Sequence, residues 1–399
     1  MFDTVQNENV KKFLQKMTES IEKNQSVIIA GKVIRVSGMK IEAAGLSVPL
    51  NTMCDIFLTN SKSISAEVIG FADQVTYLMA TENINGINHG ALVVPSARSC
   101  HARVGVQLLG RVIDGSGNPI DGRGVIKTDE FYPLMSEAIN PLIRKKISEP
   151  LDVGIRAING LLTVGKGQRI GIFAGSGVGK SVLLGMMTRF TSADVVVVGL
   201  IGERGREVKE FIEENLGEHG LAKSIVVAAP ADTSPLMRVN GAILATTIAE
   251  YFRDQGLDVL LIVDSLTRFA QSQREISLSV GEMPATKGFT PSVFAKISQL
   301  VERSGNGLNG HGSITAFYTV LIEGDDYNDP IADHVRSVLD GHIFLSRDLA
   351  GAGHYPAIDI ERSISRVMIA VVNEQQLLCA NKFKKLYSAY MQNKDLINV

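Results

Sequence analysis

The chain has 399 residues, of which 45% are hydrophobic and 21% are charged, and its net charge is −2. This length predicts two or three domains with one large core, and the composition is typical of a globular protein. The near-neutral charge disfavours a protein that grips nucleic acid through bulk positive charge, so we expect no nucleic-acid partner. The sequence has no run of 18 apolar residues, no signal pattern at its N-terminus and only three widely spaced cysteines, which favours a reduced, cytoplasmic location.

The first part of the chain predicts a helical extension at residues 1–24 and a small β-barrel at residues 25–97. The apolar residues of the extension fall at helical spacing, namely Val10, Phe13, Leu14, Met17 and Ile21. This stripe could bind a partner or pack on its own domain. Residues 25–97 contain short strand-like runs separated by Gly, Asn and Ser, which is typical of a closed barrel. Because this region lacks a titratable cluster, we expect a structural or oligomeric role for it.

Residues 98–370 predict an α/β domain. Apolar runs of strand length end at Phe173, Ile201, Ala229, Val263, Ile322 and Leu345. Helix-like segments separate most of them, and this alternation predicts a mainly parallel sheet. Residues 371–399 are helix-like and form a short C-terminal segment.

A glycine-rich stretch follows the strand that ends at Phe173. It matches the phosphate-binding P-loop, G-x-x-x-x-G-K-[ST], except that Ala174 occupies the first glycine position. The candidate phosphate-binding residues are Gly175, Ser176, Gly177, Val178, Gly179, Lys180 and Ser181. Glycines let backbone N–H groups turn toward phosphate oxygens, Lys180 adds a mobile positive charge, and the Ser181 hydroxyl can ligate Mg²⁺. An ordinary glycine-rich turn is the alternative, but the strand–turn–helix context favours a nucleoside triphosphate site.

Charged residues follow two further predicted strands. Ligands of parallel sheets lie beyond the carboxyl ends of the strands, so Lys180, Glu203 and Asp264 would converge if their strands are neighbours. Asp264 fits an acid that holds Mg²⁺ through its water shell, although it could also cap a helix beginning near Ser265. Glu203 could polarise an attacking water or pair with a nearby arginine.

Two arginines lie just past strand ends. Arg204 and Arg268 could neutralise charge that develops at a γ-phosphate. As isolated arginines, they could equally form surface ion pairs.

Several segments resemble a known family. Residues 202–208 and 262–268 are similar to the hexameric rotary ATPases. More selective are residues 281–296, 353–360 and 363–368. Together they resemble the ATPases of bacterial type III protein export, with the flagellar branch ahead of the injectisome branch, and the likeness runs from about residue 26 to 380.

The resemblance implies an Mg²⁺-dependent ATPase that energises protein export, with an N-terminal barrel, a RecA-like P-loop core and a helical end. It makes Lys180 and Ser181 the phosphate and magnesium residues, Glu203 the catalytic glutamate and Asp264 the Walker-B acid. It places Arg204 and Arg268 around the γ-phosphate. It also implies that Tyr355 stacks on adenine and that Arg366 is an arginine finger for a neighbouring subunit. The residues alone would make Arg366 an ordinary ion-pair arginine.

A finger and a P-loop on one chain imply a homohexamer. The resemblance further implies an export-apparatus regulator that binds the N-terminal region, a stalk protein and chaperone–cargo complexes. It implies a cytoplasmic protein peripheral to the inner-membrane export gate. Family members usually continue for several helices beyond the segment at 395–399, so residues 371–399 are expected to be a shortened version of the family's helical end.

Two alternatives remain. A rotary ATP synthase-type subunit or a hexameric RNA translocase has a similar core, although residues 284–291 argue against both. The other alternative is a nucleotide-binding assembly component with little turnover.

Overall fold

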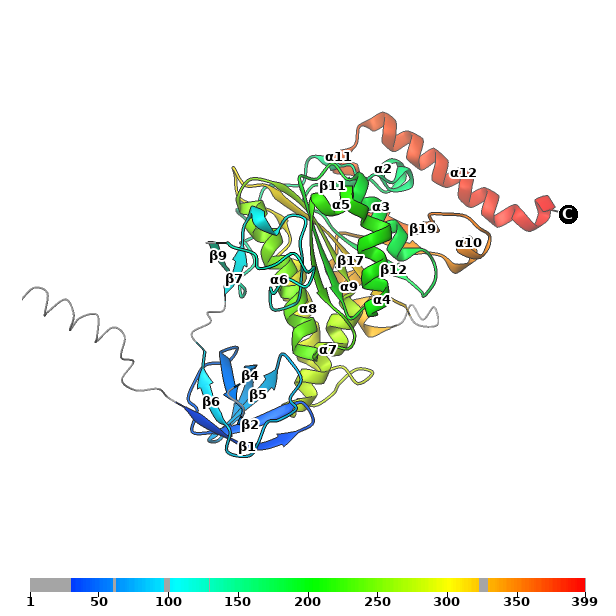
Figure 1. The fold of residues 1–399 in the computed structure, drawn as a ribbon. Coiled ribbons are helices and arrows are strands. Elements are labelled where there is room, and N and C mark those ends of the chain that lie inside the picture. Colours follow the sequence, from blue (N-terminus) through cyan, green and yellow to red (C-terminus); the bar gives the residue numbers. More distant parts are fainter. Residues whose placement is uncertain (1–29, 60–61, 97–100, 129, 323–328, 399) are drawn as a thin grey trace, which may run out of the picture. The chain divides into compact units, whose positions relative to one another are not determined.

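The computed structural model describes residues 30–59, 62–96, 101–128, 130–322 and 329–398 (Figure 1). The helical extension predicted at residues 1–24 therefore lies outside the described residues. Contacts divide the chain into two units, Met1–Ala80 with Ile84–Ala97, and Thr81–Asn83 with Arg98–Val399. Within the described ranges, none of the helices combines the length and apolar character that crossing a bilayer requires.

The first unit contains a closed antiparallel β-barrel, as predicted. Its strands are β1 Gly31–Ser37, β2 Lys40–Ala44, β3 Met53–Phe57, β4 Ser63–Ala72, β5 Val75–Ala80 and β6 Leu92–Pro95, in the spatial order β1-β2-β5-β4-β3-β6. Alternate residues of a strand point to opposite faces, so Ile41 and Ala43 of β2 are buried between half-buried neighbours. Together with Ile56, Leu78 and Val93 they fill the barrel interior.

The second unit is built on a sheet of nine strands, counted over the described residues. Edge to edge, the strands are β19 Ile358–Ser365, β18 Gly341–Leu345, β12 Arg169–Ala174, β17 Ser313–Leu321, β15 Asp258–Asp264, β13 Val195–Ile201, β14 Ser224–Ala229 and β8 Val112–Ile113, with β16 Gly305–Asn306 beside β17. All pairs from β18 to β8 are parallel, whereas β19 and β16 are antiparallel to their partners. This confirms the predicted α/β fold with a mainly parallel sheet.

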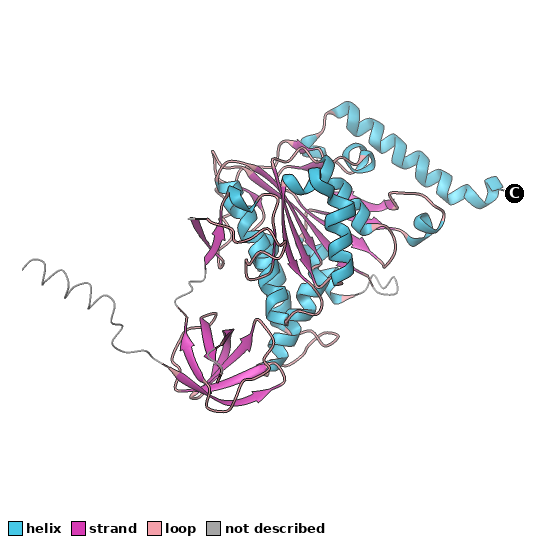
Figure 2. Ribbon diagram, in the orientation of Figure 1, coloured by secondary structure: helices cyan, strands magenta, loops and turns pink. Residues whose placement is uncertain are grey.

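Helices cover both faces of this sheet (Figure 2). One face packs on α3 Lys180–Phe190, α4 Gly205–Glu210, the π-helix η2 Phe211–Leu216 and α5 Gly217–Ala222. On the other face α6, Pro235–Asp254, comes so close that a Cβ at Gly199 of β13 would lie 3.2 Å from the Ala245 Cβ. Because both faces are covered, every residue of β13 is buried, as its continuous apolar sequence predicted.

The remaining elements surround this core. The other helices are α2 Arg156–Leu161, α7 Leu266–Ser279, α8 Pro291–Glu302, α9 Pro330–Val338, α10 Arg347–Gly351, α11 Met368–Val371 and α12 Glu374–Asn398, with the 3₁₀ turn η1 Val106–Leu108. Two small antiparallel pairs join β7 His101–Val104 to β9 Glu130–Pro133 and β10 Pro150–Leu151 to β11 Val164–Gly165. The helix α12 confirms the helical character predicted for the C-terminal segment.

Candidate functional site

The glycine-rich turn joins the carboxyl end of β12 to the amino end of α3. Gly179 caps α3 with φ 85°, and Gly177 has φ 79°, a left-handed conformation that favours glycine. A Cβ at Gly177 would meet nothing within 4 Å, so its backbone angle, not crowding, calls for glycine there. Ser176 is exposed, whereas Val178 is buried and anchors the turn. The turn therefore has an exposed tip at Ser176 and Gly177 and leads into the N-terminus of α3, which is where an anion binds favourably.

Lys180, the first residue of α3, joins two of the predicted acids. Its Nζ donates to Glu203 Oε1 at 3.1 Å and to Asp264 Oδ1 at 2.5 Å. Asp264 Oδ1 also accepts a hydrogen bond from Thr319 Oγ1 at 2.5 Å, and Asp264 and Thr319 are both buried. We call Lys180, Glu203, Asp264 and Thr319 the lysine cluster. The structure thus brings together three residues that the sequence predicted to converge.

The assumption behind that convergence needs a correction. The sequence argument required the strands before Lys180, Glu203 and Asp264 to be neighbours. Instead β17 lies between β12 and β15. The residues still meet because the carboxyl ends of all these strands lie at one edge, and the inserted strand contributes Thr319, which the sequence argument missed. Its only signal was a hydroxyl within an apolar strand, and threonine is common in strands for other reasons.

The charged groups of the lysine cluster shift one another's pKa values. Burial disfavours the Lys180 ammonium, but Asp264 and Glu203 outweigh this effect and hold the lysine pKa above its ordinary value. Burial raises the pKa of Glu203 to about 7, with a further contribution from the Asp264 carboxylate and an opposing one from Lys180. Glu203 therefore titrates near neutral pH, where a carboxylate acts well as a base.

Glu203→Gln is expected to raise the melting temperature of the nucleotide-free protein. The folded-state pKa of Glu203, about 7, lies above its ordinary value of 4.5. Between these two pKa values the folded protein binds more protons than the unfolded chain, so the stability of the fold rises as the pH falls. The free-energy cost of burying the charged carboxylate is fully present only above the folded-state pKa. Near pH 8 the variant should gain on the order of 2 kcal/mol, a shift of about a few degrees. Thermal melts across the pH range measure it.

The gain should shrink as the pH falls well below 7, because wild-type Glu203 then takes up its proton. Glu210→Gln, on the exposed side of α4, is the control and should melt like the wild type at every pH. Equal melting temperatures of Glu203→Gln and the wild type near pH 8 would contradict a costly buried carboxylate.

The two predicted strand-end arginines have different surroundings. The side chain of Arg268, on α7, lies over Gly202, where a Cβ would come within 2.7 Å of the Arg268 Cβ. Arg268 Nη1 donates to Gln271 Oε1 at 2.9 Å, while its buried Nε has no hydrogen-bond partner. A buried guanidinium N–H without an acceptor is costly, so this position suits an anion. Arg204 is 83% exposed and pairs with Glu207 at 3.2 Å, so the structure does not place it in the lysine cluster.

Tyr355 lies beside the glycine-rich turn. It belongs to the loop between α10 and β19, and a Cβ at Gly179 would be 3.3 Å from its Cε1 atom. Tyr355 is nevertheless 60% exposed. One side of its ring is therefore available to a planar group bound at the turn.

Arg366 lies at the amino ends of the parallel strands, whereas the glycine-rich turn lies at their carboxyl ends. It follows β19, whose last residue, Ser365, pairs with Gly341 at the amino end of β18. Because β18 and β12 are parallel, this edge is separated from the glycine-rich turn by the six residues of β12, or roughly 17 Å. The exposed Arg366 therefore does not meet Lys180 of its own chain.

The lysine cluster and Ser181 offer too few oxygen donors to complete the coordination of a hard cation such as Mg²⁺. Within the described ranges, no group of three or more His, Cys, Asp or Glu side chains could hold a metal ion. Asp264 and the hydroxyl of Ser181, in the first turn of α3, are oxygen donors of the kind that Mg²⁺ prefers. The remaining ligands would have to come from phosphate and water.

Comparison with known proteins identifies the family. Residues 154–365 match the nucleotide-binding domain of the ATP synthase alpha/beta family. The flagellum-specific ATP synthase of Pseudomonas aeruginosa is 57% identical over 389 residues, which cover 97% of this chain and 86% of that protein. The assembled ATPase EscN of the enteropathogenic E. coli type III secretion system superposes on this chain with a TM-score of 0.86 at 46% identity. EscN in complex with its central stalk EscO superposes with a TM-score of 0.85 at 44% identity. Each match covers 92% of this chain and 88% of the other chain. The chain therefore belongs to the ATP synthase alpha/beta family, in the group that contains the flagellum-specific ATP synthases and the type III secretion ATPases.

Proposed function

We propose that the chain is an Mg²⁺-dependent ATPase that energises protein export through a type III secretion apparatus, in the flagellar branch. The observation that carries this proposal is the lysine cluster at the mouth of the glycine-rich turn. It combines a phosphate-binding cation, an acid suited to Mg²⁺ and a glutamate that titrates near neutral pH. The high identity to a flagellum-specific ATP synthase supports the assignment to export.

ATP would bind along the turn at residues 175–181. The backbone N–H groups of the turn and the N-terminus of α3 face its phosphates, as in other P-loop sites. Arg268 Nε, buried without a partner, would gain a phosphate acceptor. The ring of Tyr355, beside Gly179, would stack on the adenine.

Hydrolysis would proceed by in-line attack of water on the γ-phosphate. Ser181 would hold Mg²⁺ through its hydroxyl and Asp264 through the water shell. Bound Mg²⁺ supplies positive charge to the β- and γ-phosphate oxygens. Lys180 is shared between two carboxylates in this structure, and it would turn to the phosphates of bound ATP. Glu203 would then be free to orient the attacking water.

Arg366 would act in a neighbouring subunit. Since it lies at the edge of the sheet remote from its own turn, it can neutralise a γ-phosphate only across a subunit interface. We therefore propose a homohexameric ring, in line with the assembled state of EscN. Arg204, exposed at the start of α4, would complete the charge around the γ-phosphate once nucleotide is bound.

The partners follow from the relatives and from the family. EscN is known in complex with its central stalk EscO, and we propose a stalk protein as a partner of this chain. We further propose an export-apparatus regulator bound through the N-terminal region, chaperone–cargo complexes as clients, and a cytoplasmic position against the inner-membrane export gate. We propose no nucleic-acid partner, in keeping with the net charge of −2.

Mg-ATP turnover per chain across a protein concentration series tests the proposed function. A site completed by a neighbour works only in an assembled ring, so specific activity should rise steeply with protein concentration. Added RNA should leave turnover unchanged, and stimulation by RNA would favour a translocase instead. Bound ATP without turnover at any concentration would favour an assembly component.

A further inference from the structure

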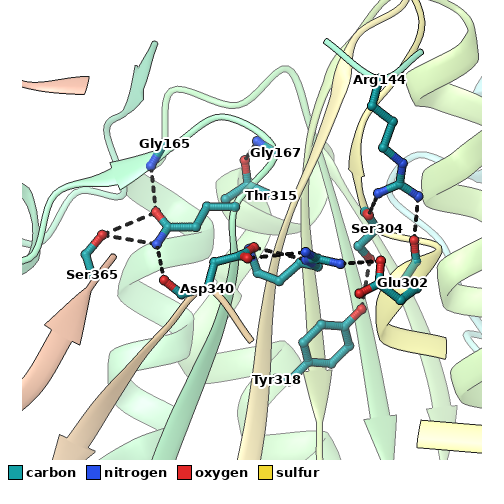
Figure 3. Close-up of polar contacts among 11 residues, drawn as sticks. Arg144, Gly165, Gly167, Glu302, Ser304, Thr315, Tyr318, Asp340 and Ser365 are labelled. Atoms are coloured by element: carbon teal, nitrogen blue, oxygen red, sulfur yellow. Dashed lines mark hydrogen bonds and ion pairs between the residues drawn. The ribbon is translucent and has the colours of Figure 1, made fainter. Parts of the chain in front are cut away.

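A buried glutamine lies beneath the backbone that carries Arg366. Gln168 immediately precedes β12 and is fully buried. Its Oε1 accepts a hydrogen bond from Gly165 N at 2.9 Å, and its Nε2 donates to Asp340 O at 3.1 Å and to Ser365 Oγ at 3.0 Å. Figure 3 shows Gly165, Asp340 and Ser365 converging at one place, although Asp340 and Ser365 lie 172 and 197 residues from Gln168 in the sequence. The amide therefore uses both of its donors and its acceptor, as buried polar groups generally do.

Two of these partners fix the position of Arg366. Ser365 is the residue before it, and Arg366 N donates to Asp340 O at 3.0 Å, the same carbonyl that Gln168 Nε2 contacts. Gln168 thus donates hydrogen bonds both to Ser365, the residue before Arg366, and to the Asp340 carbonyl, which accepts from the backbone N–H of Arg366.

The Asp340 segment is also held in place by Arg169. The Asp340 carboxylate accepts hydrogen bonds from Arg169 Nε at 3.0 Å and Arg169 Nη2 at 3.2 Å, and Arg169 pairs with Glu302 at 2.6 Å (Figure 3). A Cβ at Gly341 would lie 2.6 Å from Ile364 O, so β18 and β19 also approach closely here. The Arg366 side chain itself is exposed.

We propose that Gln168 is a positioning residue for the arginine that this chain gives to the neighbouring subunit. The inference rests on the proposed function, because Arg366 reaches a γ-phosphate only within a ring. Without the amide, Asp340 O loses one of its two donors and Ser365 loses a partner, so the base of Arg366 can shift. Since displacements of about 1 Å can lower rates by up to about a hundredfold, we expect Gln168→Leu to lower kcat about tenfold and leave KM for ATP unchanged.

A matched variant separates this role from general stability. Thr315 is buried at the same edge of the sheet, and its Oγ1 accepts from Gly167 N at 2.9 Å (Figure 3). Thr315→Val removes one buried hydrogen-bond acceptor, but the hydrogen bonds given above for Asp340 O and Ser365 do not involve Thr315. It should keep kcat within about twofold of the wild type, whereas Ser365→Ala, a milder change near Arg366, should lower kcat about threefold. Equal losses in Thr315→Val and Gln168→Leu would overturn the proposal.

Mixed rings show where Gln168 acts. Gln168→Leu keeps its own P-loop and presents a displaced arginine, while Lys180→Ala has a disabled P-loop and an intact arginine. Assembled with an excess of Lys180→Ala, the Gln168→Leu sites receive a well-placed Arg366, so their turnover per Gln168→Leu chain should return to within about twofold of the wild type.

Arg366→Ala mixed with Lys180→Ala is the reference. If these rings regain turnover and the Gln168→Leu rings do not, Gln168 does not act through the donated arginine and the proposal falls, while the proposed function stands. If neither mixture regains turnover, Arg366 is not donated to a neighbour, and the ring mechanism falls together with this inference.

Discussion

Arg366→Ala should lower kcat at least about a thousandfold while the Kd for Mg-ATP changes by no more than about threefold. An arginine that enters from a neighbour stabilises charge that develops in the transition state, so its removal leaves ground-state binding nearly intact. The backbone of Arg366 is held at the amino edge of the sheet, remote from the turn that would bind nucleotide in the same chain. Single-turnover hydrolysis and equilibrium nucleotide binding, measured above the assembly concentration, separate the two effects.

Arg362→Ala is the matched control. Arg362 lies on β19, the strand that Arg366 follows, and its partly exposed side chain pairs with Asp359 at 3.7 Å. An exposed pair of this kind contributes little, so this variant should turn over like the wild type. If Arg366→Ala kept its activity, or lost ATP binding and turnover together, Arg366 would not be a trans-acting finger.

The parts of the site that the sequence predicted are those encoded by neighbouring residues. The glycine-rich turn and Lys180 form one contiguous motif between a strand and a helix. Asp264 and Glu203 each follow a continuous apolar strand, and the rule for parallel sheets sends both to the same edge. These features need only local pattern and the direction of the strands.

The parts that the sequence did not predict depend on the order of strands in space. No local pattern says that β17 lies between β12 and β15, so the role of Thr319 was not visible. The hydrogen bonds of Gln168 likewise join segments almost two hundred residues apart, with a separation of 197 from Ser365. The position of Arg366 at the far edge also required the antiparallel pairing of β19.

Two strands are difficult to predict from the sequence for a local reason. In β3 the inward residues Cys54 and Ile56 alternate with outward residues that include the apolar Met53 and Phe57, so the alternation is hidden. The edge strand β19 has a partly exposed face, with Ile364 46% exposed, and its mixed composition resembles a loop. A hydrophobic pattern predicts a strand only when one face is clearly drier than the other.

Lys180→Ala should lower ATP turnover at least about a thousandfold. It should also destabilise the protein, measured without nucleotide, by about 3 kcal/mol near neutral pH. Lys180 would be the phosphate-binding cation, so its loss removes charge stabilisation from the reaction. It is also the cation between Glu203 and Asp264, with 11% of its side chain exposed. Its removal leaves two carboxylates without a cation at their shared site, of which Asp264 is almost fully buried. ATPase assays and thermal melts measure the two effects on one sample.

A second substitution separates the two roles of Lys180. In Lys180→Ala/Glu203→Gln only one charged carboxylate remains, so the double variant should recover most of the lost stability and none of the lost activity. Lys209→Ala, on the exposed surface of α4, removes a lysine that pairs with Glu213 at 3.7 Å and should change neither property. If the double variant melted as low as Lys180→Ala, repulsion between the carboxylates would not be the cause of the instability. Recovered stability without recovered activity would show that the Lys180 ammonium group has two separate roles. It neutralises the two carboxylates in the folded protein, and it stabilises charge on the phosphates during the reaction.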